Sequence, residues 1–422
     1  MSNVFIETIV SEDDSLRNRS INSLLQNKNK DEILKITEEL EVFRISSNNL
    51  YHKVRASLFL FVIYRFYLQE NREIKPCGRI PFEGIKAARH KNFDESIAIY
   101  LKEIKNSGLN GAVCSAIAHS YYQLSFKYLF DQVKLSISHC KENSSLFDAQ
   151  SLDDYPYQVA EELTTSAPET GLYPVGVDTT PVRIDPSHSE WSDIFFLGMD
   201  FPEGARVINI SVNLGIHGAE TPVNPPCECY SRFIEESFIY LRSVDLGLSL
   251  KISTLGELFS FDDRLSLLKA GLVASGIVPP SFEKKDIQLK HILHKLLGKS
   301  GGIEVATRVN HIPKGSRLAV STTLLATIIA RLMRFSGQIN SQTGPLTEEE
   351  RRVVASRAIL GEWMGGSGGG WQDSGGLWPG IKVITGELAK PGSPEFGVSR
   401  GCLLPNHILF SRDDIPEEVE KK

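Results

Sequence analysis

The chain has 422 residues, of which 41% are hydrophobic and 23% are charged. This composition is ordinary for a folded protein of two or three domains, and it excludes a chain dominated by disorder. The formal net charge of −6 provides no general basic surface, so we expect no binding of nucleic acid.

The N-terminal residues show no secretory signal, because they are acidic and polar through positions 11–14. The longest apolar run, residues 57–67, is about half of the roughly 20 residues that a membrane-spanning helix needs, and it contains Arg65. We therefore expect a cytoplasmic protein without a membrane segment. Six cysteines in so long a chain do not resemble a disulfide framework.

The first part of the chain, residues 1–145, is predicted to be an all-helical domain. Apolar residues at 97, 100, 101 and 104 follow helical spacing behind a cap at Asp94, and Gly108 suits the end of that helix. A longer helix is predicted over 112–138. The hairpin 87–125 faintly resembles a tetratricopeptide-type unit, but a plain helical bundle is favoured because no second copy follows. An interaction or packing role is the modest inference.

Residues 146–180 are polar and rich in Ser, Asp and Pro, which predicts a linker. From residue 181 onwards, strand patterns at 194–197 and 206–212 alternate with helical patterns at 262–275 and 347–365. Thr347 and Glu350 form a capping-box signature, and Gly365 is a natural helix end. The pattern predicts an α+β domain over 181–422.

Two pairs of metal-ligand residue types stand close together in the sequence. Cys227 and Cys229 are too closely spaced for a usual zinc knuckle, so a plain loop is favoured over a metal site. His291 and His294 lie three apart on a helical pattern, and without a third ligand nearby a solvated helix face is favoured.

The most distinctive segment is residues 365–376, where two glycine runs flank Asp373. Five glycines within six positions give up much backbone entropy, which is costly unless the main chain approaches something closely or takes positive φ angles. We expect the chain to approach a ligand phosphate or sugar here. The alternative is a glycine-rich surface turn.

A second segment, residues 312–323, runs from a small-residue loop into an apolar helical pattern that continues to residue 333. Free amides and the helix dipole favour an anion at such an N-terminus, and the hydroxyls of residues 321–323 can add to phosphate or to a phosphate-bound metal. The alternative is an ordinary helix with Ser or Thr at its cap.

A third segment covers residues 180–193 and is followed by Gly204 and the strand pattern. Together and in this order, the three segments resemble the GHMP small-molecule kinases and, within them, the L-fucokinase branch. That branch typically has sequences like ARVDLSGGWSD, IPKGSGLGTSS and GGGWQDQVGG. The resemblance covers residues from about 172 to 415, and the third motif is its most specific part.

The resemblance implies roles for individual residues. Asp373 matches the catalytic aspartate that orients or deprotonates the attacking sugar hydroxyl, and Arg183 matches the arginine that stabilises charge there. Glu362 matches the carboxylate that holds Mg²⁺ with a hydroxyl of Ser321 or Thr322. The implied ATP-binding residues are Pro313, Lys314, Gly315, Ser316, Arg317, Ser321 and Thr322. The implied sugar-binding residues are Trp191, Asp193, Gly369, Gly370 and Trp371.

The chain also departs from the family pattern. Arg317 and Ala319 stand where the family has glycines, and each adds a Cβ where the backbone approaches phosphate. Arg317 either pairs with phosphate or fills the site. The first motif has one residue too many between Arg183 and Asp193, with Pro186 and His188 in place of small residues, and the third has one too few after Asp373.

The resemblance predicts the N-terminal half of a GHMP kinase, a ribosomal S5 domain 2-like fold, with the C-terminal ferredoxin-like half mostly missing. A partner chain that supplies this half would fit the pattern. The implied function is an ATP- and Mg²⁺-dependent kinase that phosphorylates a hydroxyl of a free sugar, fucose- or heptose-like. The alternative is a catalytically inactive binding or scaffold protein.

Overall fold

The computed structural model describes residues 3–69, 79–186, 199–200, 202–215, 223–313, 315–316 and 318–411. The chain divides into two compact units. Unit 1 consists of Met1–Gln132 with Phe396–Ser399, and unit 2 consists of Val133–Glu395 with Arg400–Lys422. The predicted strand at 194–197 lies outside the described residues.

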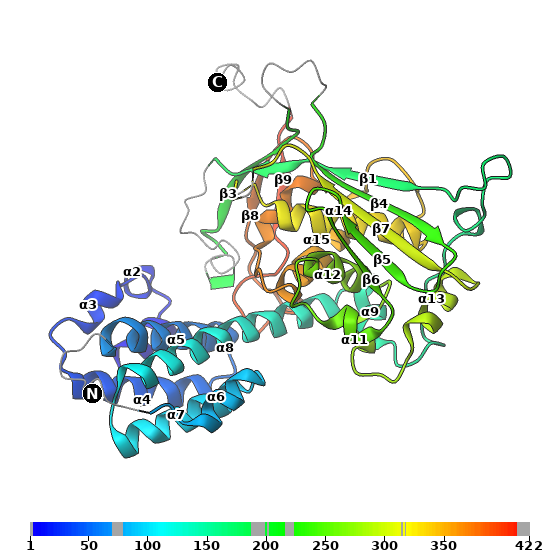
Figure 1. Cartoon of the computed structure of the whole chain (residues 1–422). Helices are drawn as coiled ribbons and strands as arrows, with labels where there is room; N and C mark the ends of the chain where they lie inside the picture. Colours follow the sequence, from blue (N-terminus) through cyan, green and yellow to red (C-terminus); the bar gives the residue numbers. More distant parts are fainter. Residues whose placement is uncertain are drawn as a thin grey trace. The chain divides into compact units, whose positions relative to one another are not determined.

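Unit 1 is built from helices, as the sequence predicts. Their bounds are α1 Val4–Val10, α2 Asp14–Arg17, α3 Ile21–Leu25, α4 Lys30–Ser46, α5 Leu50–Val62, the π-helix η1 Ile63–Leu68, α6 Phe82–Arg89, α7 Phe93–Ser107 and the start of α8 Gly111–Ser138 (Figure 1). Helix α7 ends at Gly108, as expected, but it begins one residue before Asp94 behind Asn92. No helix among the described residues is long and apolar enough to cross a membrane.

The core of unit 1 forms where the apolar faces of these helices meet. Its largest fully enclosed side chains include Phe5, Tyr64, Tyr100 and Tyr121. A buried guanidinium, that of Arg44, is satisfied inside this bundle by hydrogen bonds that include two to the Glu41 carboxylate. Buried charges are tolerated only when they are paired in this way.

Unit 2 contains a five-stranded and a four-stranded sheet. The five-stranded sheet has the order β1 Gly176–Thr180, β4 Cys227–Ile234, β7 Gly302–Val309, β5 Ile239–Ser243 and β6 Leu248–Ile252. Its strands pair antiparallel except β5 with β7. The four-stranded sheet is antiparallel throughout, in the order β2 Val182–Ile184, β3 Arg206–Val212, β8 Ile381–Thr385 and β9 Asn406–Leu409.

The helices of unit 2 confirm the predicted mixed α+β class. Their bounds are η2 Lys141–Asn143, α9 Ser144–Asp148, η3 Glu161–Leu163, α11 Leu255–Phe259, α12 Ser266–Ala274, η4 Pro280–Phe282, α13 Leu289–Leu297, α14 Val320–Phe335, α15 Glu348–Met364 and η5 Trp371–Leu377. Thr347 and Glu350 form the predicted capping box of α15. Helix α14 packs against β1 and β4, and α12 and α15 pack against α14 (Figure 1).

The stretch 146–180 is not a linker, contrary to the prediction. Tyr155 and Val159 are buried in the main core of unit 2, and residues 176–180 form β1 at the edge of the five-stranded sheet. The polar composition misleads because the strand alternates, and its inward-facing polar residue Asp178 is paired inside the fold.

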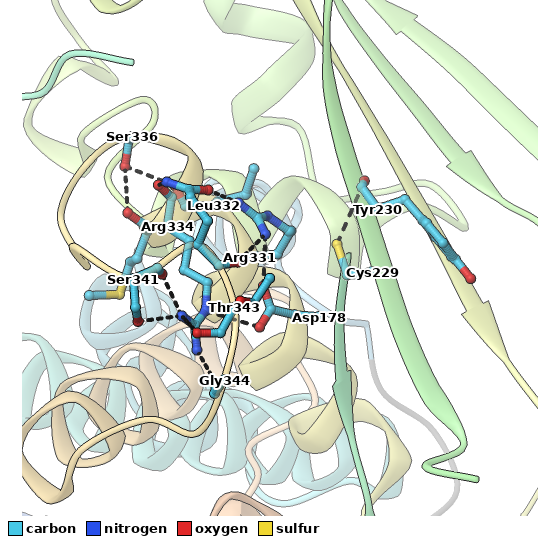
Figure 2. Close-up of polar contacts among 12 residues, drawn as sticks. Asp178, Cys229, Tyr230, Arg331, Leu332, Arg334, Ser336, Ser341, Thr343 and Gly344 are labelled. Carbon is cyan, nitrogen blue, oxygen red and sulfur yellow. Dashed lines mark hydrogen bonds and ion pairs between the residues drawn. The ribbon is translucent and has the colours of Figure 1, made fainter. Parts of the chain in front are cut away.

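Figure 2 shows how Asp178 fixes α14 to β1. Arg331 Nη1 lies 3.2 Å from Asp178 Oδ2, and Arg334 Nε lies 3.1 Å from Asp178 Oδ1. Both arginines are 1% exposed, and both also donate to the loop 341–344. These contacts hold the C-terminal half of α14, and because the helix is rigid they also place its N-terminus.

The two candidate metal pairs from the sequence take ordinary structural positions. Cys227 and Cys229 lie on β4 rather than in a loop, and both face the core. His291 and His294 are exposed on α13, as predicted. Within the described part of the chain, no three His, Cys, Asp or Glu side chains gather in a way that could hold a metal ion.

Candidate active site

The glycine segment turns the chain sharply between α15 and η5. Gly366 and Gly368 have φ angles of 80° and 64°, in the left-handed region that favours glycine. Gly369 must lack a side chain for a different reason. A Cβ there would lie 2.9 Å from the hydroxyl of Thr322 and 3.1 Å from the Glu362 side chain. The segment therefore packs closely onto the start of α14 and onto α15.

Asp373 lies in the first turn of η5, and both of its carboxylate oxygens are engaged. Oδ2 accepts a hydrogen bond of 2.9 Å from the Gly370 amide, and Oδ1 forms an ion pair with Arg183 on β2. The fold thus brings together two residues that are 190 positions apart in the sequence. It follows that Asp373 has a structural role that the flanking glycines did not suggest.

Arg183 is shared between two carboxylates. Its second partner is Asp185, which is 1% exposed and also accepts a 2.6 Å hydrogen bond from Asn209 Nδ2 on β3. Burial raises the pKa of Asp185 to about 6, although the neighbouring Arg183 charge opposes this shift. Neither Asp185 nor Asn209 is among the site residues predicted from the sequence. The available signal was the two-residue spacing of Arg183 and Asp185, which puts both on one face of a strand.

Glu362 lies on α15 and is 1% exposed. The Thr322 hydroxyl donates to its Oε1 at 2.7 Å, the Ser367 hydroxyl bonds to its Oε2, and Ser321 also hydrogen-bonds to the carboxylate. Burial raises the pKa of Glu362, and these hydrogen bonds oppose the shift. The predicted carboxylate and hydroxyls therefore meet, at the point where α14 begins.

The loop before α14 borders a cavity of about 550 Å³. Its walls are mostly apolar, and one side is formed by Pro313, Gly315, Ser316, Ala319 and Ser321. The residue that caps α14 is Ala319, which makes no side-chain hydrogen bond to the helix. The alternative of an ordinary Ser or Thr cap is therefore wrong, and the first amides of α14 have no capping side chain.

Comparison with known proteins relates the chain to sugar kinases. No family model matches it. The protein named L-fucokinase/L-fucose-1-P guanylyltransferase from Bacteroides fragilis is 29% identical over 238 residues, 54% of this chain and 22% of that protein. The bifunctional fucokinase/GDP-fucose pyrophosphorylase from Arabidopsis thaliana is 31% identical over 137 residues, 32% of this chain and 10% of that protein. Over part of its length, this chain is therefore similar in sequence to proteins named as fucokinases.

The matched region spans about a fifth or less of these relatives. Among solved structures, the chain is similar to Lactococcus lactis galactokinase complexed with galactose, with 16% identity, a TM-score of 0.32, and coverage of 54% of this chain and 47% of that one. Because the TM-score is below 0.5, this similarity carries no argument about function. The division into GHMP half-domains therefore stays a prediction.

The remaining residues implied by the fucokinase resemblance fall into two groups. Trp191, Asp193, Lys314 and Arg317 lie outside the described residues, as does His188. Trp371 is described and is fully enclosed, with 0% of its surface exposed. The structure thus gives the Trp371 ring a packing position where the sequence predicts a contact with sugar.

Proposed function

We propose that this chain is a sugar kinase of the GHMP type that binds ATP with Mg²⁺ and phosphorylates a hydroxyl of a fucose- or heptose-like sugar. The observation that carries the proposal is that Thr322, Glu362 and Asp373 all contact the glycine segment. Gly369 packs against Thr322 and Glu362, while the amide of the next residue binds Asp373. The residues implied for metal binding and for proton transfer therefore contact adjacent positions of one turn.

The N-terminus of α14 supports the placement of nucleotide phosphates. Amides without a capping side chain and the positive end of a 16-residue helix favour an anion there. The adjoining cavity of about 550 Å³ falls within the size of small-molecule sites, and its apolar walls suit a nucleoside. Burial of an apolar base beside an anion-binding helix end would account for both features.

The donor set at Glu362 fits Mg²⁺, because a carboxylate and hydroxyl groups are the oxygen ligands this ion prefers. Glu362 and Ser321 or Thr322 would hold the ion, which would neutralise charge on the phosphates. The hydroxyls now donate to the carboxylate, so they already point their oxygens toward it. A buried carboxylate with a raised pKa gains most from a nearby cation, which favours its charged form.

Arg183 and Asp373 support the proton-transfer and charge-stabilising roles. Ion pairing to Arg183 orients the Asp373 carboxylate, and a side chain that remains 16% exposed can still be reached by a hydroxyl. Phosphoryl transfer depends mainly on positioning and charge neutralisation, which a buried guanidinium between two carboxylates can supply to an arriving phosphoryl group.

A second function, binding without catalysis, is favoured by one specific observation. Both Asp373 oxygens are engaged within the protein, and the Arg183 charge is shared between two carboxylates. A site whose charged side chains pair with one another in this way can bind a nucleotide at the N-terminus of α14 without phosphorylating a sugar. Turnover separates the two functions.

The test begins with nucleotide binding and continues with turnover. MgATP at a hundredfold excess over Kd should stabilise the protein by about 2.7 kcal/mol, seen as a rise in melting temperature. Sugar-dependent release of ADP is then measured with L-fucose and a panel of hexoses and heptoses. Asp373→Asn should lower kcat by about 100-fold or more, because a positioned proton acceptor is lost.

The matched control is Asp263→Asn, which also removes a carboxylate paired with a buried cation, Lys269. It should leave kcat within about twofold. A thermal shift without turnover on any sugar supports binding without catalysis, and the absence of both ends the kinase proposal. Turnover that Asp373→Asn does not alter would remove Asp373 from the mechanism.

A further inference from the structure

Lys382 is a second cation buried beside the candidate site, on β8, and the site described above makes no use of it. Its side chain has 0% exposure. The ammonium donates to Ser211 Oγ at 2.8 Å, to the Trp378 carbonyl at 3.0 Å and to the Gly380 carbonyl at 3.3 Å. Burying an ammonium against neutral acceptors is costly, so a specific role has to offset the cost.

The first link from Lys382 to the site is mechanical. The Ser211 hydroxyl lies 2.6 Å from the Trp378 carbonyl oxygen and 3.3 Å from that of Gly375. These carbonyls belong to the end of η5 and to the residue that caps it, two and five residues after Asp373. Lys382 and Ser211 therefore hold the C-terminal end of the short helix that carries Asp373.

The second link is electrostatic. Burial lowers the pKa of Lys382 to about 7, and the charge of Asp185 opposes this shift. The same interaction favours the charged form of Asp185, which is the ion-pair partner of Arg183. A positive charge at Lys382 thus helps Asp185 to stay ionised and to keep Arg183 in place beside Asp373.

We propose that Lys382 is a positioning residue of the site, which fixes η5 through Ser211 and Trp378 and so holds Asp373 in place beside Arg183. Its effect on turnover rests on the proposed kinase function. Its effect on the order of η5 does not rest on that function.

Among the titratable groups that the structure describes around Lys382, only Asp185 and Lys382 itself have a pKa shifted to near neutral pH. His407, on the adjacent strand β9, has a pKa lowered to about 3, chiefly by burial and then by Arg352 and Lys382, so it is uncharged near neutral pH. Asp373 is linked to Lys382 through Arg183, which pairs with both Asp373 and Asp185, and the charge of Asp185 acts on Lys382. Asp185 therefore gains a proton as the pH falls through about 6, and Lys382 loses one as it rises through about 7. The two groups interact, so they titrate as a coupled pair.

Lys269 provides a matched control. It is 3% exposed on α12, donates to the Ser260 carbonyl at 2.8 Å and pairs with Asp263. It is therefore a buried lysine in the same unit whose contacts do not include η5. A general effect of removing a buried ammonium should appear in Lys269→Met as well as in Lys382→Met.

The first experiment measures hydrogen–deuterium exchange in peptides that cover residues 366–380, and it needs no activity. Lys382→Met should speed exchange in these peptides about tenfold or more, while Lys269→Met should leave it at the wild-type rate. Unchanged exchange in folded Lys382→Met overturns the proposal. Should Lys382→Met not fold, Ser211→Ala takes its place, because it removes the hydroxyl that joins Lys382 to η5 and keeps the lysine. Ser211→Ala should speed exchange in the same peptides. Unchanged exchange in this variant again overturns the proposal.

The second experiment measures turnover against pH. Lys382→Met should lower kcat about tenfold or more and leave the KM for ATP within about twofold. Lys382→Arg should restore most of kcat and move the alkaline loss of activity to higher pH, because a guanidinium keeps its charge. A kcat of Lys382→Met within twofold of wild type overturns the proposal. A wild type without turnover ends the kinase proposal instead, and the exchange measurement then decides the role of Lys382.

Discussion

Unit 2 contains two buried arginine–aspartate clusters whose composition is similar and whose surroundings differ. The Asp178 cluster consists of Asp178, Arg331 and Arg334, and the Asp185 cluster consists of Asp185, Arg183 and Asp373. In the first, two cations share one carboxylate. In the second, one cation is shared by two carboxylates.

The clusters differ most in how their remaining hydrogen-bonding capacity is filled. The arginines of the Asp178 cluster also donate to backbone carbonyls of the loop 341–344, and both are 1% exposed (Figure 2). In the Asp185 cluster, Asp373 keeps 16% exposure, and burial raises the pKa of Asp185 to about 6 although the Arg183 charge opposes this shift. An enclosed cluster that is tied to a backbone loop suits stability, whereas a cluster with an accessible carboxylate and a titrating partner suits chemistry.

The largest effect should come from breaking the Asp178 cluster. Asp178→Asn removes the carboxylate that two buried guanidinium groups share, and the loss of one partner from a buried ion pair costs about 3 to 5 kcal/mol. Chemical denaturation at pH 7 measures this loss of unfolding free energy. Asp263→Asn, at a 43% exposed carboxylate, should cost less than Asp178→Asn, because Lys269 keeps its hydrogen bond to the Ser260 carbonyl. A loss below 1 kcal/mol for Asp178→Asn would contradict a structural role of this cluster.

A smaller effect, visible as a pH dependence, should come from the Asp185 cluster. The folded-state pKa of Asp185, about 6, lies above its ordinary value of 3.8, so the protonated carboxyl stabilises the fold at low pH and this contribution is lost as the pH rises through about 6. The unfolding free energy of the wild type relative to Asp185→Asn should fall by on the order of 2 kcal/mol between pH 4 and pH 6. A difference that stays constant over this range would show that burial does not raise this pKa.

The smallest effect concerns the N-terminus of α14, the helix that the Asp178 cluster holds at its other half. Ala319 has a φ angle of 52°, which costs an L-residue about 1 to 2 kcal/mol. Ala319→Gly removes this strain but loses part of the gain to the greater freedom of the unfolded chain, so it should stabilise by up to about 1 kcal/mol. Ala326→Gly, in the interior of the same helix, should destabilise by about 1 kcal/mol. Thermal unfolding compares the two, and a destabilising Ala319→Gly would contradict the strain at this cap.

Local sequence patterns predicted much of the secondary structure. The capping box at Thr347 and Glu350, the apolar face of α14 and the strand at 206–212 follow from propensity and periodicity, which act between residues a few positions apart. The same reasoning misplaced β1 and the strand with Cys227. Both strands have polar or cysteine residues that face the core, and pairing with a neighbouring strand decides this.

The resemblance to fucokinases, rather than any spacing, supplied Arg183, Glu362 and Asp373 as a set. The structure alone shows that Asp185, Asn209 and Lys382 lie around them. These residues come from β3, β8 and the end of β2, and they meet because those strands pair in the four-stranded sheet. Strand pairing joins positions far apart in the sequence, and no local pattern specifies which positions those are.

The sequence by itself determined the capping box of α15, the end of α7 at Gly108 and the chemical character of the glycine segment, because these depend on neighbouring residues. Only the tertiary structure decided that Ala319 caps α14 with a positive φ, that Trp371 is enclosed, and that one arginine serves two aspartates. Burial and charge sharing depend on the elements that pack around a residue. For that reason the raised pKa of Asp185 and the lowered pKa of Lys382 are properties of the fold rather than of the sequence motif.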